Sequence, residues 1–372
     1  MSGSGKVIAV DSLSLPAGHR RHRAWRTWLR YITGGIWLAL VLYYGARSLW
    51  TAREGPAHLV VYAFSTQEEL FTQSILPAFE ESWEAETGRE LTIDAVFGPS
   101  ATLAGQIVLG APADVALFSN AHHVTYLRLG KMIDQDTQPH VIGGTPMVIV
   151  TRPGNPLELH DFSDLARPGL RLIHASPRSS GGGEWAVLAE YGSAQRATDD
   201  DAAAAAQLRA TWSNVRLLAP SARTAITLFE LGDGDALVTY EQDALLAQER
   251  GVPLEIVIPP RTIIAQPVAV IVDHNVTRAE QPAAEAFVRY LLSAEGQQQF
   301  AHYYQRPVNG VGAPFPPLQD PFTVEDLGGW TQAHQQIVKA LWQDEIEPRL
   351  DLETTPQLLG PGTPAADNGR DR

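Results

Sequence analysis

A serine/glycine run is the part of this sequence best suited to chemistry. Two serines, ending at Ser180, precede glycines 181–183, and from Glu184 onward apolar residues recur at helical spacing. An apolar run over 170–174 comes before them and predicts a buried strand. Glycines let backbone N–H groups converge, and the first N–H groups of a helix lack internal partners, so this order favours an anion site. The alternative is a glycine-rich turn whose serine only caps the helix.

The distribution of charge limits the kind of partner. The chain has 372 residues with 28 Lys/Arg and 42 Asp/Glu, and eight of the bases but only one acid lie in the first 53 residues. The remainder therefore carries 20 bases and 41 acids. Such an acidic body is unsuited to nucleic acid, which needs a basic face. It can still bind a small anion if the donors are uncharged dipoles.

The N-terminal region predicts a membrane segment. Residues 1–28 end in a basic cluster, which predicts a cytoplasmic tail. Residues 29–46 are apolar with aromatic flanks, as in a membrane segment, and residues 47–57 are interpreted as a linker. The arginines before the apolar segment orient the rest of the chain outside the cytoplasm. Bulky residues stand where a signal-peptide cleavage site needs small ones, which favours a retained transmembrane anchor over a cleaved signal. With no cysteine in the chain, disulfides, thiolate metal sites and an N-terminal lipid-modified cysteine are excluded.

Beyond the linker, strands and helices alternate. Apolar runs over 59–64, 91–97 and 114–118 predict strands, and helical patterns over 69–87 and 101–110 stand between them. Repeated βα units specify a mainly parallel sheet covered by helices. The runs at 146–150 and 267–272 each follow a bend and are candidate places for the chain to cross between two lobes. Residues 350–372 lack periodicity and are expected to be disordered.

Other candidate sites are weaker. The pair His122–His123 lacks the spacing of a metal site and is interpreted as surface histidines. The run 233–235 resembles a calcium loop without its closing glutamate and is interpreted as a turn. Arg223 can either bridge the lobes or face the anion. No nucleophile elbow, phosphate-binding loop or dinucleotide fingerprint occurs in the sequence. We therefore expect no metal, no cofactor and no catalytic residue.

Several segments, taken together in order, resemble the bacterial periplasmic sulfate/thiosulfate-binding proteins, the receptors of ATP-driven importers. The resemblance spans about 58–342, and any one of its segments is weak by itself. They are 80–83 with 86–88, 98–100, 113–115, 152–156, 161–165, 179–185, 222–225, 234–236, 240–241, 293–297, 303–307 and 322–330.

This resemblance implies an α/β, two-lobed type II periplasmic-binding-protein fold. The first lobe would comprise 58–143 and a return segment, 266–349, and the second lobe 144–265. Open α/β sheets bind ligands at the carboxyl ends of their strands. In the family the oxyanion is held by main-chain N–H groups, a serine hydroxyl and an indole N–H. Matched by position, the ligand-binding residues are Ser180, Gly181, Gly182, Ser100, Ala225, Phe64 and Tyr240.

Three positions depart from the family's pattern. Phe64 stands where an aspartate is usual, Tyr240 stands in place of the tryptophan donor, and Glu184 in place of a frequent arginine. Glu184 has two interpretations: a first-turn acid that suits the helix dipole, or a proton acceptor that would select a protonated oxyanion such as hydrogen phosphate.

The resemblance implies an extracytoplasmic solute receptor that captures sulfate or thiosulfate and hands it to the permease of an ABC transporter. The receptor would be periplasmic and tethered to the inner membrane by 29–46, or secreted if that segment is cleaved. The alternatives are a receptor for phosphate or another oxyanion, and an enzyme that uses the same fold on an anionic substrate.

Overall fold

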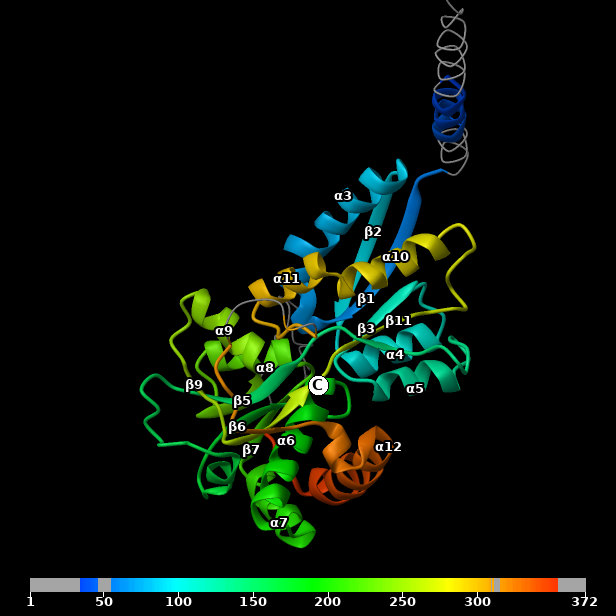
Figure 1. Ribbon diagram of the computed structural model, residues 1–372. Helices are drawn as coiled ribbons and strands as arrows, with labels where there is room; N and C mark the ends of the chain where they lie inside the picture. The colour runs from blue at the N-terminus through cyan, green and yellow to red at the C-terminus, as the bar shows by residue number, and fades with distance from the viewer. Residues whose placement is uncertain (1–33, 46–54, 309, 311–314, 354–372) are drawn as a thin grey trace, which may run out of the picture. The chain divides into compact units, whose positions relative to one another are not determined.

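The computed structural model describes residues 34–45, 55–308, 310 and 315–353, in two units, Met1–Gly55 and Pro56–Arg372 (Figure 1). In the first unit, residues 34–45 are helical. The predicted tail 1–28 and the ends of the predicted membrane segment 29–46 lie outside the described residues, as does 354–372. Among the described residues, no helix combines the length and apolarity needed to cross a bilayer.

The first lobe of the second unit is built on a five-stranded sheet of order β2-β1-β3-β11-β4. The strand β1 pairs in parallel with β2 and β3, while β11 runs antiparallel to β3 and β4. The strands are β1 (Ala57–Phe64), β2 (Leu91–Gly98), β3 (Val115–Phe118), β4 (His140–Val141) and β11 (Val268–Ile271). All four residues of β3 are buried, as expected of a central strand covered on both faces.

Helices cover both faces of this sheet. One continuous helical stretch follows β1, changes register through a π segment and ends at Gly88, whose φ of +69° is the left-handed conformation typical of a glycine cap. Its pieces are η1 (Ser65–Gln67), α2 (Glu68–Leu70), η2 (Phe71–Ile75) and α3 (Leu76–Thr87). The other helices are α4 (Ser100–Val108), α5 (His122–Leu129), α10 (Gln281–Leu292) and α11 (Ala294–His302).

The second lobe is built on a seven-stranded mixed sheet of order β12-β10-β5-β8-β6-β7, with β9 paired to β5. Its central strand β5 is buried at every residue. The strands are β5 (Thr145–Thr151), β6 (Leu172–Ala175), β7 (Val215–Ala219), β8 (Ala236–Tyr240), β9 (Glu255–Val257), β10 (Arg261–Ala265) and β12 (Asp320–Phe322).

The helices of this lobe include the one that the glycine run begins. They are η3 (Phe162–Ala166), α6 (Gly181–Thr198), α7 (Asp201–Trp212), α8 (Ala222–Glu230), α9 (Glu241–Glu249), η4 (Val324–Leu327), α12 (Gly329–Ala333), η5 (His334–Ile346) and η6 (Glu347–Arg349). Ser180 caps α6 by accepting a hydrogen bond from the N–H of Gly182.

The chain crosses between the sheets three times, between β4 and β5, between β10 and β11, and between β11 and β12. The prediction that all of 266–349 returns to the first lobe is wrong for its C-terminal part. There β12 pairs with β10, and η5 packs on α6. The physical reason is an apolar face of η5, including Trp342, which is buried in the core of the second lobe.

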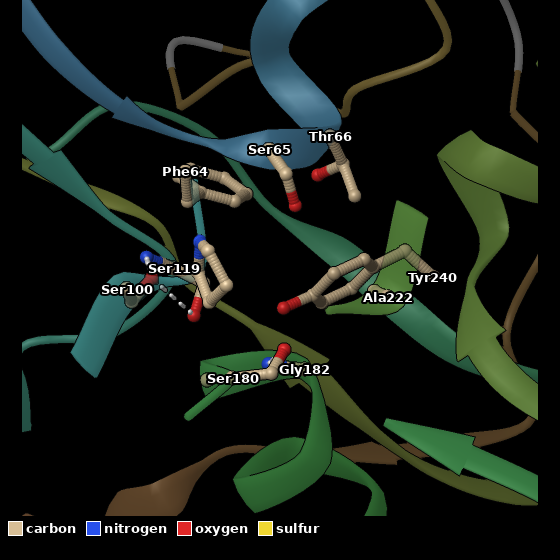
Figure 2. Close-up of a pocket in the computed structure, with 11 residues that line it drawn as sticks. Phe64, Ser65, Thr66, Ser100, Ser119, Ser180, Gly182, Ala222 and Tyr240 are labelled. Carbon is tan, nitrogen blue, oxygen red and sulfur yellow. Dashed lines mark hydrogen bonds between the residues drawn. The ribbon is translucent and has the colours of Figure 1, made fainter. Parts of the chain in front are cut away.

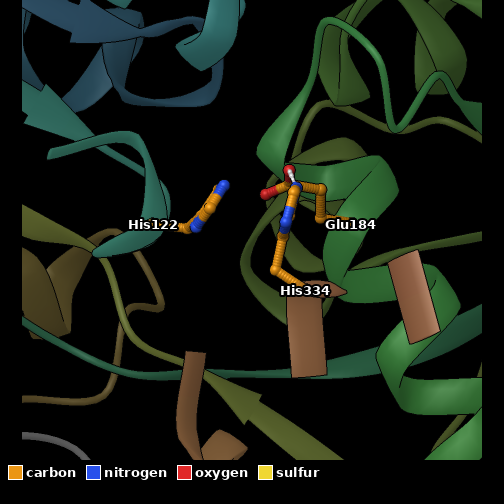
Figure 3. A group of neighbouring side chains, drawn as sticks. All are labelled: His122, Glu184 and His334. Atoms are coloured by element: carbon orange, nitrogen blue, oxygen red, sulfur yellow. Dashed lines mark ion pairs between the residues drawn. The ribbon is translucent and has the colours of Figure 1, made fainter. Parts of the chain in front are cut away.

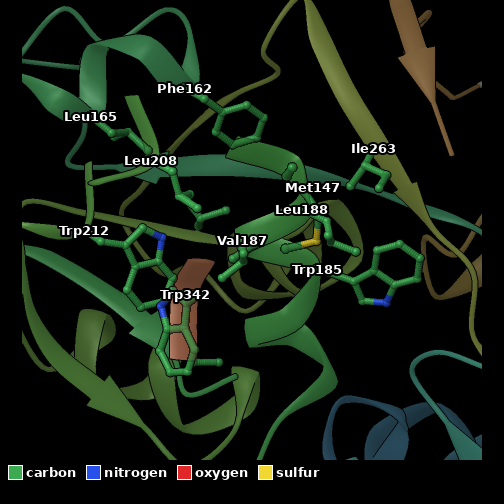
Figure 4. Close-up of a cluster of buried hydrophobic side chains, with 14 of the residues drawn as sticks. Met147, Phe162, Leu165, Trp185, Val187, Leu188, Leu208, Trp212, Ile263 and Trp342 are labelled. Carbon is green, nitrogen blue, oxygen red and sulfur yellow. The ribbon is translucent and has the colours of Figure 1, made fainter. Parts of the chain in front are cut away.

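The core of the second lobe holds the glycine-loop helix in place. Trp185, near the start of α6, is fully buried with Trp212 and Trp342 in one apolar cluster (Figure 4). Burying a side chain of this size contributes about 1.5–3 kcal/mol. The start of α6 is therefore anchored by packing as well as by its cap.

Candidate functional site

A small pocket lies between the two lobes, at the ends of strands from both sheets (Figure 2). Its empty volume, which includes space open to solvent, is about 170 Å³. The lining residues are Phe64, Ser65, Thr66, Pro99, Ser100, Ser119, Ser180, Gly181, Gly182, Ala222 and Tyr240. None of them carries a charged side chain.

Three helices begin at this pocket. Ser100 opens α4 in the first lobe, and Gly181 and Ala222 open α6 and α8 in the second. A helix N-terminus carries about half a positive charge and N–H groups without internal partners. Three such ends facing one cavity make it electropositive without a lysine or an arginine.

The glycines of the loop are required by close contacts. A Cβ at Gly182 would lie 3.0 Å from the Cβ of Ala222 and 3.2 Å from the hydroxyl of Tyr240, and a Cβ at Gly181 would overlap the hydroxyl oxygen of Ser119. Only glycine therefore lets the loop approach both the pocket and the facing lobe.

Two hydroxyls in the pocket have no protein partner. Tyr240 and Thr66 are both buried, and neither hydroxyl oxygen has a hydrogen-bond partner among the described residues. Burial raises the pKa of the Tyr240 phenol, more than neighbouring Ser119 lowers it, so the phenol is a proton donor at neutral pH. In Figure 2 this hydroxyl points into the pocket, on the side where Ser119 and Ser180 lie. Buried hydroxyls are costly to leave unpaired, which indicates a ligand that accepts hydrogen bonds.

Other polar groups position the pocket wall. The hydroxyl of Ser100 accepts a hydrogen bond from the backbone N–H of Ser119 at 3.1 Å. Across the lobes, the N–H of Ala101 donates to the carbonyl of Ser179 at 3.0 Å, and the indole of Trp185 donates to the carbonyl of Ser119 at 2.8 Å. The lobes are thus joined directly beside the cavity.

Six of the seven expected ligand-binding residues line this pocket. The exception is Ala225, which is fully buried in the core of the second lobe, while Ala222, three residues earlier, lines the cavity. The cause is the helix start, because Ser221 caps α8 and leaves only its first residue at the pocket. Our sequence analysis missed four further lining residues, Ser65, Thr66, Pro99 and Ser119. Ser65 and Ser119 directly follow β1 and β3, so their place at a strand's carboxyl end was an available signal.

The interpretation of Glu184 as an acceptor for the ligand is wrong. Its carboxylate is buried outside the pocket lining and accepts a hydrogen bond from the amide of Asn120 at 2.7 Å. A residue in the first turn of a helix can point away from the cavity that its neighbours face, because successive side chains are about 100° apart.

Arg223 and the histidine pair also have defined places. Arg223 does not line the pocket, and its guanidinium lies 3.9 Å from the carboxylate of Glu69 in the other lobe, which supports the lobe-bridging interpretation. The interpretation of His122 and His123 as surface histidines is wrong, because His123 is fully buried and His122 half-buried. In the described part of the chain, His122, Glu184 and His334 form the group of side chains able to hold a metal ion.

Fold and pocket together define a two-lobed binding protein with a small, uncharged, donor-rich site. Residues 59–304 match the family described as bacterial extracellular solute-binding protein, and the chain belongs to this family.

Named relatives support the assignment. The chain is 34% identical over 297 residues to the sulfate-binding protein of Escherichia coli, covering 75% of this chain and 89% of the relative. It is 32% identical over 275 residues to the thiosulfate-binding protein of Pseudomonas aeruginosa, covering 70% and 83%. Among solved structures, the sulfate-binding protein SubI of Mycobacterium tuberculosis matches with a TM-score of 0.69 and 28% identity, covering 75% of this chain and 99% of that one.

Proposed function

We propose that this protein is an extracytoplasmic receptor that binds a fully ionised tetrahedral oxyanion, sulfate or thiosulfate, and delivers it to the permease of an ABC importer. The observation that carries the proposal is the pair of unpartnered buried hydroxyls, Tyr240 and Thr66, in a pocket where three helices begin. The names of the relatives, sulfate-binding and thiosulfate-binding proteins, support the same ligand class.

The proposed ligand contacts are the hydroxyls of Ser100, Ser180, Thr66 and Tyr240 together with the N–H groups of the glycine loop. Phe64 contributes apolar wall, and Ala222 takes the place first expected of Ala225. Convergent neutral donors in a dry cavity stabilise an anion without a counter-charge. This explains how so acidic a chain can bind one.

The lining favours sulfate over hydrogen phosphate. A protonated oxyanion needs an acceptor for its own O–H group, and no carboxylate lines the pocket. A buried donor left unpaired costs about 1–3 kcal/mol, or about 5- to 150-fold in affinity. The same lining holds no titratable acid–base pair, which supports a receptor rather than an enzyme on an anionic substrate.

Calorimetry of the purified full chain with sulfate, thiosulfate, phosphate and molybdate tests this proposal. We expect sulfate or thiosulfate to bind most tightly, with an affinity nearly constant between pH 6 and pH 8. Preferential binding of phosphate, or no binding of any oxyanion, would refute the proposal.

We also propose that the apolar segment 29–46 is retained as an anchor that holds the receptor at the outer face of the cytoplasmic membrane. The basic tail before it and the absence of a small-residue cleavage site support this. Fractionation tests it, because an anchored protein stays with membranes in high salt and keeps its N-terminus. A mature N-terminus near residue 47 in the soluble fraction would exclude the anchor.

A further inference from the structure

A second cavity, behind the glycine loop, contains a cluster that the proposed oxyanion site does not use. It is lined by residues of both lobes, including Tyr126 of α5, Glu184 of α6 and His334 at the start of η5, and its empty volume is about 590 Å³. His122 lies beside it on α5, with its ring stacked on that of His334 at a centroid distance of 3.6 Å.

The ligand atoms of three side chains converge here. One atom each of His122, Glu184 and His334 lie within 4.8 Å of one another (Figure 3). The Nε2 atom of His334 is 3.8 Å from a Glu184 oxygen, and the Nε2 atom of His122 is buried without a hydrogen-bond partner among the described residues. We infer that His122, Glu184 and His334 form a binding site for a divalent transition-metal ion such as Zn²⁺.

The donor set suits that class of ion. Two imidazoles and one carboxylate are a common set for zinc and related divalent metals, with bonds of about 2.0–2.2 Å and an open position for water or an exogenous ligand. Tetrahedral bonds of that length place ligand atoms about 3.4 Å apart, so metal binding requires these atoms, now within 4.8 Å of one another, to approach by up to about 1.4 Å. The open position would face the cavity.

The buried carboxyl group of Glu184 has no permanently charged partner in the described part of the chain. Glu184 is buried, and no lysine or arginine of the described residues forms an ion pair with it. Arg178, which also lines the cavity, is paired with Glu347 at 2.6 Å. Buried carboxylates are normally paired or bound to metals.

A hydrogen-bonded second shell orients the carboxylate. The amide of Asn120 donates to Glu184 at 2.7 Å, and its oxygen contacts Nδ1 of His123 at 2.9 Å and accepts from the backbone N–H of His122 at 3.1 Å. Outer-shell partners of this kind fix the direction of ligands in known metal sites. Asn120 is therefore a positioning residue for the metal.

The ligands come from both lobes, which gives the ion a further effect. His122 belongs to the first lobe, and Glu184 and His334 to the second, with Glu184 two residues beyond Gly182. A metal that joins the lobes favours the closed arrangement, so it increases the affinity for the oxyanion, and the oxyanion increases the affinity for the metal by the same factor. This coupling rests on the proposed function, whereas the metal site does not.

The test is a titration of the metal-free full chain, in sulfate-free buffer, with Zn²⁺ followed by calorimetry and with Co²⁺ followed by its visible absorption. We expect one ion per chain. His334→Gln and Glu184→Gln should weaken binding by more than about 100-fold, and Asn120→Ala by about 10- to 100-fold. The matched control is His160→Gln, which changes an exposed histidine and should leave binding unchanged.

Circular dichroism of each variant distinguishes loss of a metal ligand from loss of folding. Because His334 lies at the cavity edge, His334→Gln is the substitution least expected to disturb the fold. Zn²⁺ binding with equal affinity to the wild type and to a folded His334→Gln variant overturns the inference, as does no binding by the wild type. A chain that binds Zn²⁺ but no oxyanion keeps the metal site and refutes only the proposed function. If the protein binds Zn²⁺ but its sulfate affinity is the same with and without the metal, only the coupling is refuted.

Discussion

Removing one oxygen atom, by Tyr240→Phe, is expected to change stability and ligand affinity in opposite directions. The phenol hydroxyl is buried at the pocket and has no hydrogen-bond partner among the described residues. In the anion-free protein, burial removes the hydration of this hydroxyl, and no hydrogen bond to the described residues replaces it. An unsatisfied buried group costs about 1–3 kcal/mol, so the variant should be more stable than the wild type in sulfate-free buffer.

With sulfate bound, the same hydroxyl becomes a donor to a charged acceptor. Hydrogen bonds of this kind contribute about 1.5–3 kcal/mol, so Tyr240→Phe should weaken sulfate binding by about 10- to 150-fold. Saturating sulfate raises the free energy of unfolding of the wild type, and this increase should be smaller in the variant by a similar amount.

Urea denaturation without anion and calorimetry with sulfate measure the two effects. Tyr290→Phe is the matched control, because the Tyr290 hydroxyl lies outside the pocket, 3.4 Å from a carboxylate oxygen of Glu295. It should leave sulfate affinity unchanged. The reasoning is refuted if Tyr240→Phe destabilises the anion-free protein while its sulfate affinity stays at the wild-type value.

Three further predictions use the loop, the lobe contact and a buried acid. Gly182→Ala should weaken sulfate binding about 5- to 150-fold by overpacking. The control is Gly105→Ala, where a Cβ meets nothing within 4 Å, and this variant should bind sulfate normally in calorimetry. Equal sulfate affinities of the two variants would place the anion elsewhere. Glu69 pairs across the lobes with Arg250 at 3.1 Å, so Glu69→Gln should weaken sulfate binding about 1.5- to 5-fold, an effect that salt should diminish; a salt-independent effect would contradict this origin. Burial raises the pKa of Asp243 to about 7, so the native state keeps a proton that the unfolded chain releases above about pH 4. Stability should therefore fall as the pH rises from 4 to 7, and Asp243→Asn should remove about 4 kcal/mol of that fall in urea denaturation; parallel pH profiles would exclude this role.

Much of the fold follows from local patterns. The predicted strand 91–97 and the structure's β2 (Leu91–Gly98) differ by one residue, and the predicted helix 69–87 is one helical stretch ending before Gly88. Such elements are readable because alternating burial, helical periodicity and caps act over a few residues. The place of Phe322 and Trp342 in the second lobe was not readable, since an apolar helix face does not specify which sheet it covers.

The sequence by itself determined the serine/glycine loop, the cap at Ser180 and the start of α6, because these depend on glycine's backbone freedom and on the unpaired N–H groups of one helix. Tertiary structure alone decided which groups meet across the lobes. It placed Ala222 rather than Ala225 at the pocket, and it brought Thr66 and Tyr240 into the lining of the same pocket. It also directed Glu184 toward two histidines. These outcomes depend on the directions of side chains from elements far apart in the chain, which are set only when the sheets and helices pack.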